Sequence, residues 1–190
     1  MTVWAVLAGG KGSRYGGPKA AASHGDTTFL GHCLSVIEEA SEPGDTIAVS
    51  VAFDWQPDIP AHCTMVADTL DAPGPAHSIA RLAQCALDRN ENLVFMAVDM
   101  LGVTPPTLRL LRDRAAASVR AGRPAVAVAR GGAGLHWVLG AVPAPLAASI
   151  VSNGDSVSAV QVLLRLCPVD AVDVQPDELL DVNTPELRPD

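Results

Sequence analysis

Short apolar runs alternate with segments of helical periodicity along most of the chain, and this alternation restricts its fold more than any other feature. Residues 3–8 and 93–98 have the length and continuous apolar character of buried strands. Residues 29–40 and 105–121 repeat their apolar side chains at the spacing of an amphipathic helix. Strands separated by helices form mostly parallel sheets that are covered on both faces. The sequence therefore predicts a single α/β domain over residues 1–190, Rossmann-like, with three layers and a mostly parallel central sheet.

The other expected elements complete the same pattern. Strands are expected at 46–52, 64–67, 124–129, 135–142 and 171–174, and helices at 76–88, 144–151 and 156–167. Thr104 is placed as the N-cap of the helix that starts with Pro105, and Gly122 marks its end. A chain of 190 residues buries about two-thirds of its unfolded surface, so folding needs neither a disulfide nor a structural metal.

The distribution of charge is more informative than its total. The chain carries 21 acidic against 13 basic side chains, and its formal net charge is −8. Nucleic acids and anionic membranes bind clustered Lys and Arg, so neither is an expected partner. The only two lysines, Lys11 and Lys19, lie in one glycine-rich stretch beside Arg14. An acidic protein with all its lysine in one stretch is predicted to have one local anion site.

Several absences indicate a cytoplasmic protein. No apolar run approaches the roughly 18 residues of a membrane-spanning helix, and the N-terminus lacks the charged start and cleavage site of a signal peptide. His32 and His62 each precede a cysteine, but adjacent residues point in different directions, so zinc is not expected. The cysteines form no CxxC pair and are interpreted as buried free thiols in a reducing cytosol: Cys33, Cys63, Cys85 and Cys167.

The glycine-rich loop, residues 9–19, follows the first expected strand. Glycines let the backbone approach a ligand and turn its N–H groups inward, while Arg14 and Lys19 supply charge for phosphate oxygens. Such a loop suits a triphosphate. A Walker A loop would need GK followed by Ser or Thr, whereas Lys19 follows Pro18. A weak GxGxxxG pattern leaves a nicotinamide oxidoreductase as an alternative.

Three carboxylates are candidates for a functional role beside this loop. Asp99 follows the apolar run 93–98, where a charge is otherwise out of place, and it is the preferred ligand for a divalent cation. Asp68 follows another short strand at the same expected rim. Asp181 lies in a polar turn near the C-terminus and is a candidate for a second metal ligand. The alternatives are a helix cap for Asp99 and a solvated turn for Asp181.

The loop resembles a known family signature. Its sequence is Leu7-Ala8-Gly9-Gly10-Lys11-Gly12-Ser13-Arg14-Tyr15-Gly16 with Lys19, similar to LAGGxxxRxG…K of the nucleotide-diphospho-sugar transferase superfamily. Within it, the molybdenum-cofactor guanylyltransferase-like (MobA-like) NTP transferases are most similar. Three later features resemble that group in order and spacing: Gly74-Pro75 after Asp68, the strand-end Asp99, and Asp181-Val182-Asn183-Thr184-Pro185-Glu186.

The resemblance implies a reaction and a role for each matching residue. A phosphorylated acceptor such as molybdopterin would attack the α-phosphorus of a nucleoside triphosphate, favoured as GTP, and pyrophosphate would leave. Arg14, Lys19 and Asp99 are the implied catalytic residues, and Mg²⁺ would be held by Asp99 and Asp181. The implied nucleotide-binding residues are Leu7, Ala8, Gly9, Gly10, Gly12, Ser13, Lys19, Asp68 and Gly74.

The chain also departs from that family in three places. Pro18 stands where an Asp usually precedes the lysine, and Ala52 stands where the second strand usually ends in Asn. Asn153-Gly154-Asp155-Ser156 replaces a basic cluster that is expected on the acceptor side. These departures leave two alternatives open: a nucleotidyltransferase that uses CTP or another acceptor, and a nucleotide-binding regulatory protein that has lost its acceptor site.

Overall fold

The computed structural model describes residues 1–9, 17–52, 54–69 and 74–179. Within these ranges seven strands form one sheet in the order β5-β4-β1-β6-β8-β7-β9. All of them run in one direction except β8, which is antiparallel to β6 and β7. The strands are β1 (Thr2–Leu7), β4 (Thr46–Val51), β5 (Cys63–Ala67), β6 (Asn92–Ala97), β7 (Val126–Gly131), β8 (Gly134–Val142) and β9 (Val169–Asp173). The predicted α/β fold with a mostly parallel central sheet is confirmed.

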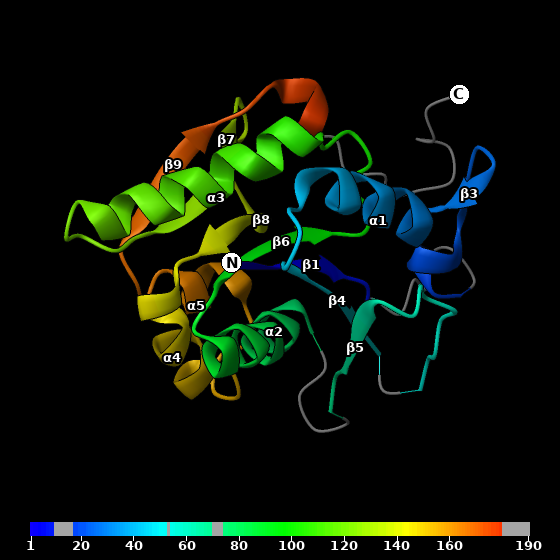
Figure 1. Cartoon of the computed structure of the whole chain (residues 1–190), viewed down its shortest axis with the longest axis horizontal. Helices are drawn as coiled ribbons and strands as arrows, with labels where there is room; N and C mark the ends of the chain where they lie inside the picture. The colour runs from blue at the N-terminus through cyan, green and yellow to red at the C-terminus, as the bar shows by residue number, and fades with distance from the viewer. Residues whose placement is uncertain (10–16, 53, 70–73, 180–190) are drawn as a thin grey trace.

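Helices cover both faces of the sheet (Figure 1). One face carries α1 (Phe29–Ala40) and α3 (Pro105–Arg120), and the other carries α2, α4 and α5. The second group is α2 (Pro75–Arg89), α4 (Ala144–Asn153) and α5 (Val160–Leu164). A short hairpin and two 3₁₀ helices complete the described elements: β2 (Ser23–His24), β3 (Thr27–Thr28), η1 (Lys19–Ala21) and η2 (Pro176–Leu179).

β1 explains why the apolar runs of this sequence are continuous. Every residue of β1 is buried, and successive side chains enter opposite layers. Trp4 and Val6 belong to the core beneath α1 and α3, whereas Val3, Ala5 and Leu7 belong to the core beneath α2. A strand that is covered on both faces favours apolar side chains at successive positions, so residues 3–7 of β1 do not alternate with polar residues.

Most predicted elements lie within a few residues of their expected places, but the helix expected at 156–167 is wrong in extent. Only Val160–Leu164 is helical. The chain turns after α4 where Gly154 packs against Ala80 of α2, and a Cβ at position 154 would overlap the Ala80 side chain. Ala159 is then extended, so the backbone is held away from helical geometry before α5 begins.

Two smaller expectations are also corrected. The hairpin of β2 and β3 was not predicted, because strands of two residues are too short to show periodicity. Cys33 and Cys167 are buried as expected, whereas Cys63 and Cys85 are only partly buried, and all four are free thiols. The thiol of Cys33 lies 3.5 Å from the Val98 carbonyl oxygen, and burial raises its pKa far above the ordinary value, with the charge of Asp99 adding to the effect.

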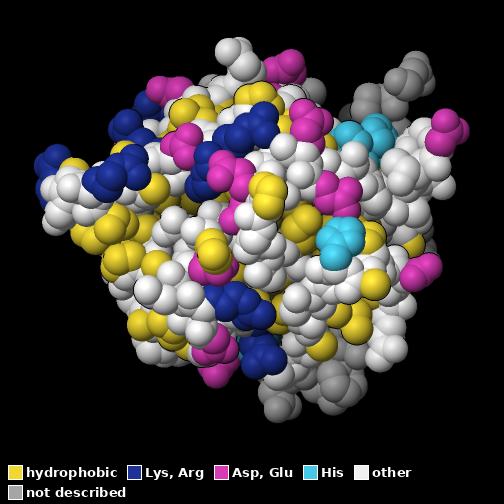
Figure 2. Space-filling model, in the orientation of Figure 1, with side chains coloured by type: hydrophobic (Ala, Val, Ile, Leu, Met, Phe, Trp, Pro, Cys, Tyr) yellow, Lys and Arg dark blue, Asp and Glu magenta, His cyan; other side chains and the backbone are white. Residues whose placement is uncertain are grey.

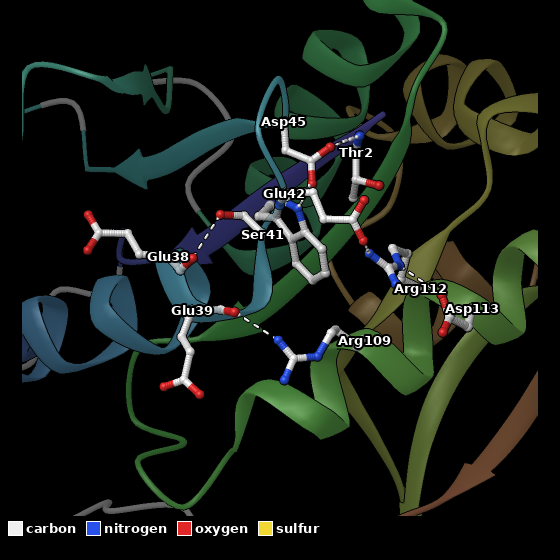
Figure 3. A network of polar contacts seen from close by, with 10 residues as sticks. Thr2, Glu38, Glu39, Ser41, Glu42, Asp45, Arg109, Arg112 and Asp113 are labelled. Atoms are coloured by element: carbon white, nitrogen blue, oxygen red, sulfur yellow. Dashed lines mark hydrogen bonds and ion pairs between the residues drawn. The ribbon is translucent and has the colours of Figure 1, made fainter.

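The amino ends of β1 and β4 are tied together by Asp45, which directly precedes β4 (Figure 3). Its carboxylate accepts hydrogen bonds from the Thr2 backbone N–H at 2.9 Å, the Trp4 indole at 2.7 Å and the Glu42 backbone N–H at 3.0 Å. Trp4 is fully buried, so its indole N–H depends on this acceptor. The guanidinium of Arg112 on α3 lies 5.7 Å from the Trp4 ring centroid and 2.9 Å from the Glu42 carboxylate. One carboxylate thereby links the amino ends of β1 and β4, at the end of the sheet opposite the predicted site.

The outer surface over α1 and α3 mixes basic and acidic side chains (Figure 2). Pairs such as Arg112 with Glu42 and Arg114 with Asp170 neutralise much of the arginine on this face. None of the helices within the described ranges is long and apolar enough to cross a membrane.

Replacing Asp45 by Ala is expected to lower the free energy of unfolding by about 2 kcal/mol, because the buried indole N–H of Trp4 loses its acceptor. Urea unfolding followed by tryptophan fluorescence measures this loss. The exposed Asp58, replaced by Ala, is the matched control. A loss for Asp45→Ala no larger than that of the control would contradict this account of the sheet edge.

Candidate active site

The residues that follow the parallel strands lie together at the carboxyl ends of those strands. Ala8 and Gly9 follow β1, Asp68 follows β5, and Asp99 lies two residues beyond β6. Backbone hydrogen bonds continue the sheet past the strand ends: Ala8 N–H to the Ser50 carbonyl at 2.9 Å, and Asp68 N–H to the Val51 carbonyl at 2.8 Å. In open α/β sheets, ligands bind at this carboxyl edge.

A cavity of about 270 Å³ opens at this edge. It is framed by the ends of β1 and β6, the first turn of α2, η1 and a residue of β8. Its described lining residues are Leu7, Gly9, Lys19, Gly74, Pro75, Ser78, Ala97, Val98, Asp99 and Val138. Five of the predicted site residues, Leu7, Gly9, Lys19, Gly74 and Asp99, are therefore brought together around one space.

Lys19 and Asp99 form the charged centre of the cavity. The Lys19 ammonium donates a hydrogen bond of 2.7 Å to Asp99 Oδ2, although 80 positions separate the two residues. Their side chains are only 14% and 21% exposed, so the pair is shielded from bulk water. A lysine and a carboxylate in one half-buried cavity provide a donor for anionic oxygens and a ligand for a hard cation.

Asp68 forms a second polar group beside the cavity. Its carboxylate is 5% exposed, and the Ser78 hydroxyl on α2 lies 2.9 Å from each of its oxygens. Gly9 lies directly against it, since a Cβ at that position would stand 2.6 Å from Asp68 Oδ2. Glycine at position 9 thus lets the end of β1 pass beside a buried carboxylate. Asp68 therefore contacts two residues that line the cavity, Gly9 and Ser78.

Burial raises the pKa of Asp68 above its usual range. The hydrogen bond from Ser78 and the nearby His77 and Arg81 act in the opposite direction without cancelling the effect. The pKa is raised because transfer from water disfavours the charged carboxylate.

The remaining predicted site residues differ in what can be said of them. Ala8 is buried within the core at the end of β1, 1% exposed, and its placement against a base stays a prediction. The other five lie outside the described residues: Gly10, Gly12, Ser13, Arg14 and Asp181. Among the described ranges, no three His, Cys, Asp or Glu side chains come together as ligands of a metal ion.

The segment 153–156, where the resemblance led us to expect a basic cluster, lies beside the first turn of α2. Asp155 Oδ1 stands 3.1 Å from His77 Nδ1, and the other ring nitrogen of His77 is 3.2 Å from the Thr69 hydroxyl. His77 is 6% exposed, so it connects the segment to the chain that follows Asp68. This segment therefore presents an exposed carboxylate close to a buried histidine ring, and no group of cations.

Ser78 and His77 are site residues that the sequence analysis missed. Both lie on α2 soon after Gly74, and their apolar neighbours Ala76 and Ile79 place them in an ordinary helical pattern. Their roles depend on Asp68 and Asp155, which reach them from other elements. The sequence contains no local signal for such contacts.

The sheet, the glycine at the end of β1 and the paired Lys19 and Asp99 define an α/β protein with a charged cavity at the carboxyl ends of its parallel strands. A family model for the MobA-like NTP transferase domain matches residues 4–172. The chain therefore belongs to the MobA-like NTP transferase family, and it is a nucleotidyltransferase. The match spans all seven strands of the sheet except the first two residues of β1 and the last residue of β9.

Solved structures share this fold. Rv0371c from Mycobacterium tuberculosis H37Rv is 22% identical, with a TM-score of 0.73 over 96% of this chain and 92% of that one. It has also been solved in complex with manganese. Molybdopterin-guanine dinucleotide biosynthesis protein A from Archaeoglobus fulgidus is 18% identical, with a TM-score of 0.70 over 98% and 94%.

A cytidylyltransferase has the same fold as well. The 2-C-methyl-D-erythritol 4-phosphate cytidylyltransferase from Thermus thermophilus is 14% identical, with a TM-score of 0.63 over 96% of this chain and 93% of that one. Among curated proteins, no sequence matches this chain.

The raised pKa of Asp68 leads to a pH-dependent prediction. The folded protein binds this proton more tightly than the unfolded chain, so the associated stability is present at low pH and is lost as pH rises through the folded pKa. Asp68→Asn keeps the shape without the charge, and it is expected to be more stable than the parent at about pH 7, with a smaller difference at about pH 4. Urea unfolding of both proteins at both pH values measures the difference, because the other titrating groups are common to the two. Equal differences at the two pH values would contradict the prediction.

Proposed function

We propose that this protein transfers a nucleoside monophosphate, GMP from GTP, to a phosphorylated small acceptor such as molybdopterin in a reaction that requires Mg²⁺. The observation that carries the proposal is the Lys19–Asp99 pair in the cavity at the carboxyl edge of the sheet. A paired cation and carboxylate in this cavity would supply the contacts to phosphate and metal that nucleotidyl transfer needs. The cytoplasm is the proposed location.

In the proposed reaction, an acceptor phosphate oxygen attacks the α-phosphorus of the triphosphate. The bond from that phosphorus to the oxygen bridging to the β-phosphate breaks, and pyrophosphate leaves with the electron pair. Lys19 would donate to phosphate oxygens and stabilise the charge that develops on them, with Arg14 and the amides of Gly10, Gly12 and Ser13 as further donors. Reactions of this kind depend on positioning and electrostatic stabilisation, so a separate acid–base pair is not required.

The donor set at the cavity fits a divalent cation. Asp99 provides a carboxylate that lines the cavity and is partly accessible. Mg²⁺ in proteins is bound by one or two carboxylates together with waters and substrate phosphates, so Asp99 can serve as the protein ligand at the cavity. Asp181 is the proposed second ligand. When bound, the cation would neutralise charge on the phosphate oxygens. Manganese in the complex of Rv0371c supports the choice of a divalent cation.

The choice of base is proposed to depend on Asp68. A buried carboxylate that lies against Gly9 offers an acceptor for the N–H groups of guanine, and Leu7, which lines the cavity, offers an apolar contact for the base. The Archaeoglobus fulgidus protein, whose name refers to guanine dinucleotide biosynthesis, supports GTP. The shared fold of a cytidylyltransferase makes CTP the second candidate.

A panel of GTP, CTP, ATP and UTP, each with and without Mg²⁺, tests the proposed nucleotide by thermal shift. GTP with Mg²⁺ is expected to raise the melting temperature most, and Asp68→Asn is expected to reduce the advantage of GTP over the others. Pyrophosphate release with molybdopterin then tests the acceptor. A largest shift with CTP would replace GTP in the proposal. If no triphosphate binds or turns over, the protein does not carry out this transfer.

Asp99→Asn is expected to lower the rate of pyrophosphate release on the order of a hundred- to a thousandfold, because a preorganised charge contact at the reacting phosphates is lost. Steady-state pyrophosphate assays measure the rate, and circular dichroism verifies that the variant is folded. Asp58→Ala, an exposed carboxylate on a loop, is expected to keep the parent rate. A folded Asp99→Asn protein with the parent rate would remove Asp99 from the catalytic machinery.

Lys19→Met is expected to change two affinities in opposite directions. Triphosphate binding weakens by about tenfold or more, since a charged hydrogen-bond donor is lost. Binding of Mn²⁺ to the protein alone becomes tighter, because Asp99 no longer shares its charge with the ammonium. Calorimetry measures the first affinity and electron paramagnetic resonance of free Mn²⁺ the second. Lys19→Arg, which retains the charge, is the control, and weaker Mn²⁺ binding by Lys19→Met would contradict the prediction.

A further inference from the structure

A buried carboxylate, Glu178, joins the C-terminal helix η2 to the start of α3. Glu178 is 8% exposed. Its Oε1 accepts a hydrogen bond of 3.2 Å from the Thr104 backbone N–H and another from the Thr104 hydroxyl. The Thr107 hydroxyl lies 2.7 Å from Oε1 and 2.8 Å from Oε2. The carboxylate is thus surrounded by donors from the first turn of one helix.

This contact replaces the ordinary cap of α3. Thr104 occupies the N-cap position as the sequence predicts, but its hydroxyl donates to Glu178 instead of bonding to its own helix. Pro105 and Pro106 follow it and have no backbone N–H to offer. A negative side chain from 74 positions later in the chain therefore meets the positive end of the helix.

The same C-terminal segment also packs against the loop between β6 and α3. A Cβ on Gly102 would overlap the carbonyl oxygen of Asp177, so the two backbones are in close contact there. Leu179 is 6% exposed and belongs to the core beneath α1 and α3. It lies against Gly131 of β7, where a Cβ would overlap its side chain. The segment 176–179 is therefore fixed on both of its sides.

The loop that this segment contacts is the one that carries Asp99. On its other side, the carbonyl oxygen of Leu101 lies 3.0 Å from Nε2 of His32 on α1. Met100, Leu101 and Val103 are buried, which is unusual for a connecting loop. The loop is thus held between α1 and the C-terminal segment, with Asp99 at its beginning.

We propose that Glu178 is a positioning residue for the divalent cation of the transfer reaction, a role that rests on the proposed function. Glu178 fixes the segment 176–179 to the start of α3, and in the same segment Asp177 packs on Gly102 of the loop that carries Asp99. It is not among the described residues that line the cavity, so it acts through these neighbours. Outer groups that orient the ligands of a metal commonly change its affinity by about 10- to 100-fold.

The chemistry of the contact supports a role beyond stability. A buried carboxylate loses the hydration that it has in water, and apolar residues of similar volume often pack with equal or better stability. The carboxylate of Glu178 is buried next to Thr104 and Thr107 and close to the tight contact of Asp177 with Gly102. It therefore fixes one arrangement of the segment 176–179 relative to the start of α3. One side of this contact packs on the loop that carries Asp99, the carboxylate that lines the cavity.

The test measures Mn²⁺ affinity by electron paramagnetic resonance, in the presence of saturating α,β-methylene-GTP and without it. Glu178→Gln keeps the size and removes the charge, and it is expected to weaken Mn²⁺ binding by about tenfold. Affinity for the nucleotide analogue without metal is expected to stay at the parent value. Thr107→Val removes one hydrogen-bond donor to the same carboxylate, and it is expected to weaken Mn²⁺ binding to a smaller degree. In the double variant, the loss of Mn²⁺ affinity is expected to be smaller than the sum of the two single losses.

Asp45→Asn is the control for a purely structural effect. It weakens a network at the opposite edge of the sheet, so it is expected to lower the melting temperature and leave Mn²⁺ affinity at the parent value. Folded Glu178→Gln and Thr107→Val proteins that bind Mn²⁺ as the parent does would overturn the positioning role and leave Glu178 as a helix cap. If the parent binds neither Mn²⁺ nor the analogue, the proposed function fails, and the role of Glu178 fails with it.

Discussion

The pairing of β1 with β4 on one side and β6 on the other is the constraint on which the rest of the structure depends. β1 is parallel to both neighbours and buried on both faces. Its backbone hydrogen bonds and the packing of its side chains therefore fix both its register and its place in the sheet. The network around Asp45 ties the amino ends of β1 and β4 together. The carboxyl ends of the same strands lie at the opposite end of the sheet, where the residues that follow them line the cavity.

Parallel pairing places the residues that follow β1, β5 and β6 at the same edge. Gly9, Asp68 and Asp99 meet there although they are far apart in sequence, and Lys19 closes the group from η1. Each of these side chains is held by a neighbour: Asp68 by Ser78, and Asp99 by Lys19. These contacts fix the charged groups of the cavity in place, which is the arrangement that the proposed electrostatic stabilisation requires.

The last described segment completes the edge from the other end of the chain. η2 packs on the loop that carries Asp99, and the carboxylate of Glu178 neutralises the start of α3. Two helices and the C-terminal segment therefore surround one loop. The antiparallel β8 extends the sheet beyond β6, and its Val138 adds an apolar wall to the cavity.

The sequence by itself determined the fold class, most of the elements and the family. Strands that are buried on both faces appear as continuous apolar runs, and the glycine-rich loop is a contiguous motif, so both can be recognised locally. It also indicated Lys19, Asp68 and Asp99 as residues of one edge, and the structure brings Lys19 and Asp99 into contact with Asp68 nearby. Only the tertiary structure decided the direction of β8, the short length of α5, and the partners Ser78, His77 and Glu178. Their positions depend on contacts between segments remote in sequence, whose geometry follows from packing of the whole chain and leaves no periodic or compositional signal.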